Sequence, residues 1–125
     1  MNDFFPPPTA PEDPSQVSVG LAYIVKVMTC ETAEIAFAAT VPHEDGSHTI
    51  YRFVLPSHSR LATRFFRKAG IRPNRVRETW DVDQGGFLIG FTGTRVGTDA
   101  VPEIDEKNPL REVVVLEQVT ISQTS

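Results

Sequence analysis

The chemistry that this sequence offers most clearly is electrostatic. Residues 58–77 contain seven basic side chains and no aspartate or glutamate, whereas the rest of the chain has five basic and all sixteen acidic residues, a balance of −11 within a net charge of −4. Six of the seven are arginines, whose planar guanidinium groups can pair with two phosphate oxygens. The stretch is typical either of a surface that contacts phosphates or of a solvent-exposed helix paired with nearby acids. The seven residues are Arg60, Arg64, Arg67, Lys68, Arg72, Arg75 and Arg77.

An aromatic residue, Trp80, follows this basic stretch closely. Proteins that bind single-stranded nucleic acid combine cations that hold the backbone with aromatic rings on which bases stack. Trp80 is the best candidate for such a ring, and Tyr51 is the second. Lys26 and Arg52 are charges within otherwise apolar strands, so we expect them on a solvent-facing surface of the same site. The alternative for Trp80 is structural, as a side chain that closes one end of the core.

The sequence has no residue pattern typical of an enzyme or of a metal site. It contains no GxSxG, GxxxxGK or GxGxxG motif, and its single cysteine, Cys30, excludes an intramolecular disulfide. The three histidines, His43, His48 and His58, lack the spacing of a metal-binding pair on one helix and would need two strand ends to converge. We therefore expect no catalysis, no cofactor and no metal.

Hydrophobic periodicity predicts five strands and one helix. The turn signal Asp45-Gly46 separates the second and third strands. For the helix, Ser57 or Ser59 can act as N-cap, and Gly70 is placed to end it. The predicted strands are residues 20–28, 34–41, 48–55, 86–96 and 111–121, the helix is residues 57–70, and the intervening loops include residues 72–84 and 97–109.

Side-chain alternation assigns faces to these elements. It places Leu21, Tyr23, Val25 and Val27 on one face of the first strand, and Val113, Val115, Val119 and Ile121 on one face of the last. Leu61, Phe65 and Ala69 stack at helical spacing. The three glycines of the fourth strand, Gly86, Gly90 and Gly93, indicate tight bending or close backbone approach.

The order of elements predicts the fold class. Three strands, a helix and two strands are the element order of the OB-fold, so we expect a mainly β protein with a five-stranded antiparallel barrel and one helix between strands 3 and 4. A different sheet of helices and strands is the alternative. Residues 1–16, rich in proline and acidic residues, are predicted to be a disordered tail that precedes an OB-fold-like domain at 17–125.

A family resemblance accompanies this prediction. Gly20-x-x-Tyr23-Ile24-x-Lys26-Val27, then Ser59-Arg60-Leu61 with Phe65 and Ala69-Gly70-Ile71, then a glycine-rich strand and Val113-Val114-Val115 resemble the small single-stranded-DNA-binding proteins of phages and mobile elements. The similarity spans residues 17–122. It lies in the order of the elements and the general character of their residues rather than in a signature motif. It implies an OB-fold, a role in replication or recombination, and no metal. Many such proteins end in an acidic tail, whereas this chain ends in Ser122-Gln123-Thr124-Ser125.

The function predicted from the sequence is non-enzymatic binding of single-stranded DNA, or RNA, in the cytoplasm of a bacterial or host cell. The alternative is a protein-interaction or structural OB module, such as a phage-encoded inhibitor or assembly component, in which the arginines meet an acidic protein. A protein partner could also bind the N-terminal tail or the acidic loop at residues 99–106, and homo-oligomers are possible. No apolar run is long enough to cross a bilayer, so no membrane partner is expected.

Overall fold

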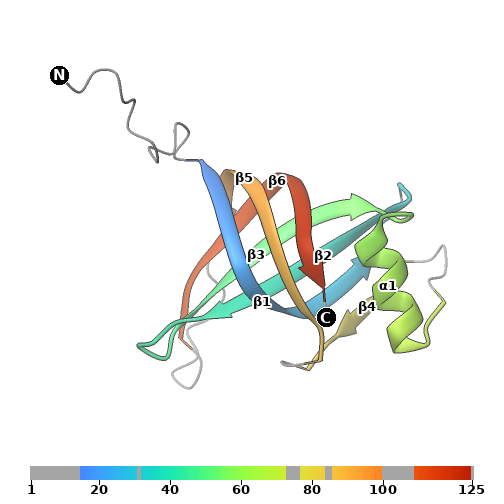
Figure 1. Ribbon diagram of the computed structural model, residues 1–125, viewed down its shortest axis with the longest axis horizontal. Helices are drawn as coiled ribbons and strands as arrows, with labels where there is room; N and C mark the ends of the chain where they lie inside the picture. The colour runs from blue at the N-terminus through green and yellow to red at the C-terminus, as the bar shows by residue number, and fades with distance from the viewer. Residues whose placement is uncertain (1–14, 31, 73–76, 84–85, 100–108, 125) are drawn as a thin grey trace.

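The computed structural model describes residues 15–30, 32–72, 77–83, 86–99 and 109–124. These residues form six strands and one helix (Figure 1). In chain order they are β1 (Gln16–Thr29), β2 (Glu34–Pro42), β3 (His48–Pro56), α1 (Arg60–Ala69), β4 (Thr79–Asp81), β5 (Leu88–Asp99) and β6 (Leu110–Thr124).

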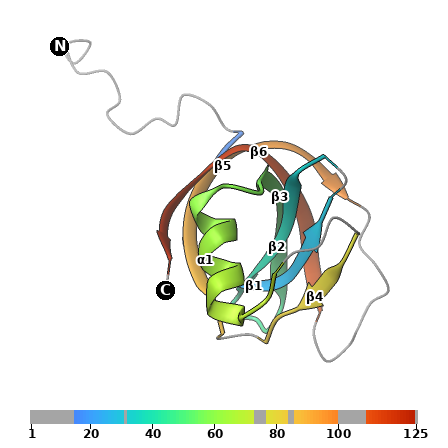
Figure 2. The same ribbon diagram turned by 90° about the vertical axis from the view of Figure 1, so that its right-hand side faces the viewer.

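Five of the strands close into a barrel. Around the ring, β1 is followed by β2, β3, β6 and β5, and β5 pairs again with β1. The helix α1 follows the third barrel strand in sequence and lies across one end of the barrel (Figure 2). The mainly β, OB-like barrel with a helix between its third and fourth strands is thereby confirmed.

One pairing differs from the antiparallel barrel that was expected. β3 and β6 run parallel, with Thr49 opposite Glu112 and Arg52 opposite Val115. Directions cannot alternate all the way around a ring with an odd number of strands, so a closed five-stranded barrel must contain at least one parallel pair. The connection between these two strands is long and contains α1, β4 and β5.

The short strand β4 lies in a segment predicted as a loop, residues 72–84. It pairs with Lys26–Met28 of β1. This is the same edge of β1 that pairs with β5 nearer the N-terminus, between Gln16 and Tyr23. Two further backbone bonds extend the contact, from the Thr29 amide to the Glu78 carbonyl and from the Val82 amide to the Val25 carbonyl, each 2.9 Å. β1 is thus long enough to have two successive partners along one edge.

The core-facing residues of β1 do not follow strict alternation. Ala22, Ile24 and Val27 are fully buried, whereas Leu21 is 51% exposed, so the predicted face is correct only at Val27. Between Ile24 and Lys26, β1 contains one residue more than the paired segment of β2. Such a bulge exchanges the two faces of a strand, which explains the change.

A similar irregularity changes the face of β6. The predicted Val113 is buried, but so are Val114 and Leu116, whereas the predicted Val115 is only half-buried. Thr92 and Thr94 of β5 pair with Thr120 and Glu117, so β6 has an extra residue here, and Gln118 has a φ of 53°. After this bulge the predicted residues Val119 and Ile121 do pack against the core.

The helix α1 is capped as its sequence indicates. Of the two serines considered, Ser59 is the N-cap, and its hydroxyl accepts a hydrogen bond from the Ala62 amide at 3.3 Å. Gly70 ends the helix with a φ of 68°, a left-handed conformation that glycine adopts without strain. Leu61, Ala62, Phe65 and Phe66 are buried, while Ala69, predicted to stack with them, is exposed.

Close backbone approach at the fourth barrel strand is confirmed at Gly90. A Cβ atom there would lie 2.8 Å from the Gly20 carbonyl oxygen, too close for any other residue to be accommodated without movement. This strand extends to Asp99, into a predicted loop, and β6 extends to Thr124.

The barrel begins slightly earlier than its predicted start at residue 17. Gln16 is the first residue of β1, and the Ser15 carbonyl accepts a hydrogen bond of 2.7 Å from the Arg95 amide. Residues 1–14, the rest of the predicted tail, lie outside the described residues. In the part of the chain that is described, no helix is long and apolar enough to span a membrane.

Candidate nucleic-acid interface

The barrel has a seam where β3 and β6 separate. The two strands pair only between residues 48–52 and 110–115. Beyond these residues, within the described chain, β3 pairs only with β2 and β6 only with β5. We call the space between residues 53–56 of β3 and residues 116–124 of β6 the seam. Two hollows lie along it.

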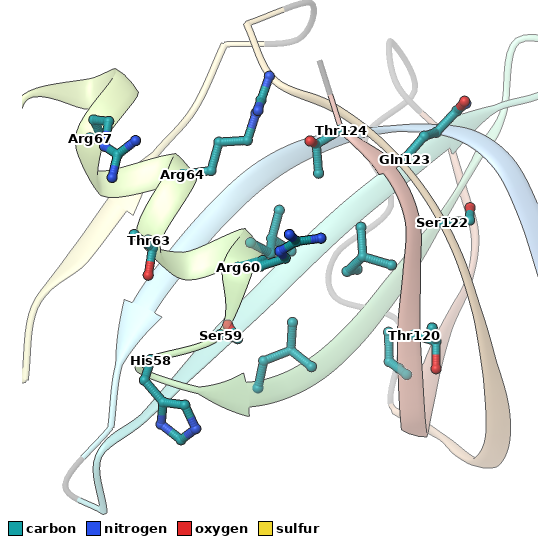
Figure 3. A pocket seen from close by; sticks show the side chains of 14 residues that line it. His58, Ser59, Arg60, Thr63, Arg64, Arg67, Thr120, Ser122, Gln123 and Thr124 are labelled. Carbon is teal, nitrogen blue, oxygen red and sulfur yellow. The ribbon is translucent and has the colours of Figure 1, made fainter.

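The larger hollow, which we call the helix groove, has a volume of about 910 Å³ and lies between α1 and β6 (Figure 3). Its floor is aliphatic and its walls are polar. The lining residues are Leu55, residues 58–61, Thr63, Arg64, Arg67 and residues 119–124. None of them, all within the described chain, is an aspartate or glutamate. Three arginines therefore line a cavity whose described lining has no acidic side chain, a composition suited to an anion.

The arginines form one row along α1. Arg60, Arg64 and Arg67 occupy successive turns of the same helix face, and the row is about 10 Å long from its first to its last Cα at 1.5 Å per residue. In Figure 3, Arg60 extends from the helix toward β6, and Thr124 points from β6 toward the helix, while Thr120 and Ser122 stand on the other side of the strand. The groove thus has a cationic wall and a largely neutral one.

At two of its three arginines, the charge of this wall is not neutralised within the described chain. Neither Arg60 nor Arg67 makes an ion pair with a described carboxylate, in contrast to Arg95 and Arg111, which each lie 2.9 Å from one. The first turn of α1 also contains no acidic residue. Because the N-terminus of a helix carries a partial positive charge, Arg60 lies where a cation is disfavoured and an anion would be favoured.

The second hollow, which we call the strand groove, has a volume of about 610 Å³ and continues along the seam from the helix groove. It contains the predicted site residue Arg52, but Glu34 and Glu117 line it too. The rest of its lining is Ala36, Phe37, Phe53, Val54, Val115, Leu116 and Gln118. Arg52 is therefore close to the helix groove along the seam but in surroundings of mixed charge.

The other predicted cations are engaged elsewhere or lie outside the grooves. Lys68 is on α1 but does not line the helix groove, because its ammonium group lies 5.1 Å from the centre of the Phe87 ring. Lys26 forms an exposed ion pair of 3.6 Å with Asp81. Arg72 and Arg77 are exposed on the segment after α1. Arg75 and most of the acidic loop at residues 99–106 lie outside the described residues.

The predicted stacking residues are both packed against other rings. Trp80 makes an edge contact with Phe66 at 5.3 Å between ring centres and lies against the core, half-exposed. Tyr51 makes an edge contact with Phe91 at 5.6 Å. Partial burial raises the pKa of the Tyr51 hydroxyl, an effect that the nearby Glu112 reinforces and Arg95 opposes. Neither ring lines the helix groove.

The histidines do not come together. His43 shares a hydrogen bond of 2.6 Å with the hydroxyl of Thr49, whereas His58 lines the helix groove. Among the described residues, no group of three histidine, cysteine, aspartate or glutamate side chains could hold a metal ion.

The β6 wall of the helix groove was not predicted from the sequence. Residues 119–124 lie more than fifty positions from the arginines that they face, so no local pattern connects the two. One signal was present: residues 118–124 contain no acidic side chain. Such a segment is compatible with a position opposite a row of cations.

Comparisons with known proteins add no relative to this description. No protein-family model, curated protein or solved structure matches the chain. The resemblance to phage single-stranded-DNA-binding proteins therefore stays a prediction from the sequence, and the function has to be inferred from the site.

Proposed function

We propose that the protein binds single-stranded nucleic acid, with DNA as the first candidate, in the helix groove and without catalysis. The observation that carries the proposal is the acid-free lining around Arg60, Arg64 and Arg67 in a chain with a net charge of −4. Phosphates dominate the affinity of proteins for nucleic acids, and arginine is the side chain best suited to hold them. An acidic protein that places three arginines in one groove without acidic side chains is adapted to a local, strongly charged ligand.

The shape of the site favours a single strand. The groove has a wall on each side, α1 and β6, so a single backbone can enter between them while a duplex meets the walls first. OB-fold proteins bind oligonucleotides, commonly on the outer face of strands 2 and 3 and the adjoining loops. In this protein the corresponding β2–β3 surface contributes to the strand groove, which contains Glu34, so the helix side is electrostatically better.

The second candidate is an acidic peptide bound by the same arginines. The unpaired edge of β6 favours it, because an extended peptide can add to an open strand edge. The bulge at Gln118 disfavours it, since irregular strands are poor templates for further pairing. We therefore rank nucleic acid first.

The biological setting that we propose follows from the sequence resemblance. It is the replication or recombination of a phage or other mobile element, in the cytoplasm of the host cell.

Fluorescence anisotropy with labelled oligo-dT and with a duplex of equal length, over a range of salt concentrations, tests the proposal. Three phosphate contacts predict a slope of about −2 in a plot of log K against log salt, at roughly −0.7 per contact for single strands. We expect oligo-dT to bind more tightly than the duplex. Replacement of Arg60, Arg64 and Arg67 by alanine should remove most of the slope, and further loss on replacing Arg72, Arg75 and Arg77 would extend the contact beyond the groove.

The matched control is Arg95→Ala, which removes an arginine that is paired with Glu112. It should leave the slope unchanged. Absence of binding by the parent protein, or an equal effect of the control, would refute the proposed function and leave the acidic-peptide candidate.

A further inference from the structure

The aromatic side chains of the barrel pack mainly against one another. The described chain has nine of them, and eight make ring contacts with centres 5.3–5.7 Å apart: Phe37, Tyr51, Phe53, Phe65, Phe66, Trp80, Phe87 and Phe91. The ninth is Tyr23, half-buried on β1. Most of these rings fill the core, which is what a small barrel requires of large apolar side chains.

The described lining of the helix groove has no phenylalanine, tyrosine or tryptophan, and its one ring is the imidazole of His58, which precedes α1. Its apolar surface consists of Leu55, Leu61, Val119 and Ile121, all aliphatic. Leu61 is 1% exposed, so the floor is closed and continuous with the core. A base entering this groove would find no flat π-surface on the floor, while the phosphates would find three guanidinium groups on one wall.

The dimensions of the arginine row also point to the backbone. Arg60 and Arg64 are one helical turn apart, about 6 Å along the axis. The row is about 10 Å long from its first to its last Cα, which accommodates two or three consecutive phosphates of one strand.

From these observations we propose that the helix groove is a base-independent clamp for the sugar–phosphate backbone. Two or three consecutive phosphates of a single strand lie along Arg60, Arg64 and Arg67, and the bases are directed out of the groove. This inference rests on the proposed function and makes it more specific, because single-strand binding by stacking on Trp80 would use a different surface.

The clamp has a consequence that a stacking site does not share: the bases contribute almost nothing to affinity. Stacking on an aromatic side chain strengthens binding by roughly five- to a hundredfold per base. An oligonucleotide without bases should therefore bind a stacking site much more weakly, but it should bind a phosphate clamp as well as the complete strand does.

The experiment measures the affinity of the full chain for oligo-dT and for an abasic phosphodiester oligomer of equal length, at several salt concentrations. We expect the two dissociation constants to agree within about fivefold, which is the smallest effect expected of one stacking contact. The salt slopes should be the same. An abasic oligomer that binds more than about fivefold more weakly would overturn the clamp while leaving single-strand binding intact. If neither oligomer binds, the proposed function itself fails.

Two variants locate the contact. Arg64→Gln should weaken binding of both oligomers equally, and Trp80→Leu should change neither affinity as long as circular dichroism shows that the variant is folded. A selective loss of oligo-dT binding in Trp80→Leu would place the bases on Trp80 and overturn the proposal. The comparison of the two oligomers on the parent protein requires no variant, so it is decisive even if Trp80→Leu does not fold.

Discussion

The helix groove and the strand groove lie along one seam, yet they offer opposite environments to an anion. Both use β3 and β6 as walls, with consecutive residues of β6 passing from the strand groove into the helix groove. The helix groove has three arginines and no acid, whereas the strand groove has Arg52 together with Glu34 and Glu117. What separates them is the third element, which is α1 in one case and β2 in the other.

The comparison shows why a helix is the better support for a row of cations. On α1, residues three and four apart share a face, so three arginines of one short segment can point into the same space. On a strand, outward residues are two apart and stand beside those of the neighbouring strands, which here bring carboxylates.

The largest effect should follow from giving the helix groove the acid that it lacks. Thr63 is exposed on α1 and lines the groove. We expect Thr63→Glu to weaken oligo-dT binding by about tenfold or more, since a like-charge contact costs on the order of 1 kcal/mol or more when partly shielded from water. Titration by fluorescence anisotropy measures it.

Thr63→Gln is the control for this change, because glutamine has the size of glutamate without its charge. Its affinity for oligo-dT should be within about twofold of that of the parent protein, because glutamine does not introduce the charge–charge contact that weakens binding by Thr63→Glu. Equal weakening by both variants would show that shape, not charge, distinguishes the two grooves.

A smaller effect concerns stability. Arg60 lies in the first turn of α1, against the helix dipole, so Arg60→Gln should stabilise the protein by about 0.3–1 kcal/mol while weakening oligo-dT binding. Thermal unfolding followed by circular dichroism tests the first part. If Arg60→Gln lowers the melting temperature, Arg60 stabilises the fold, and its position is explained without a ligand.

In the strand groove, the reverse test is to remove acidic side chains instead of adding one. Glu34→Gln together with Glu117→Gln should tighten oligo-dT binding by about two- to threefold, a few tenths of a kcal/mol, as expected for exposed charges near a bound anion. Competition between parent and variant for one labelled oligonucleotide resolves a change of this size. Weaker binding by the double variant would mean that these carboxylates hold Arg52 in place for the ligand.

The smallest effect lies outside both grooves, where cations are paired. The Asp45 carboxylate accepts hydrogen bonds from the Ser47 hydroxyl and amide and from Arg111, and these lower its pKa well below the ordinary value of 3.8. Because the pKa is lower in the folded state, the charged Asp45 stabilises the protein at pH values above its ordinary pKa. This stabilisation is lost as the pH falls from the ordinary pKa to the folded-state pKa.

The melting temperature of the parent protein relative to Asp45→Asn reports this contribution. We expect the parent to melt slightly higher, by a constant difference between pH 7 and about pH 5, with the difference shrinking below about pH 4. A difference that grows as the pH falls would contradict the sign of the shift.

Local sequence determined most of the elements. Ser59 and Gly70 mark the ends of α1 because their capping bonds involve only neighbouring residues, and β2 and β3 lie within one residue of the ranges predicted for the second and third strands. The separation of charge was also visible in the sequence.

Only the tertiary structure decided which faces and which cations form the site. The bulges in β1 and β6 depend on how many residues the partner strand supplies, and alternation within one strand contains no information about its partner. The contiguous basic stretch is divided by packing: Lys68 lies over Phe87, while Arg60 faces the far end of β6. A row of arginines on a helix is a local property, but the wall that turns it into a groove comes from distant residues that the barrel brings opposite to it.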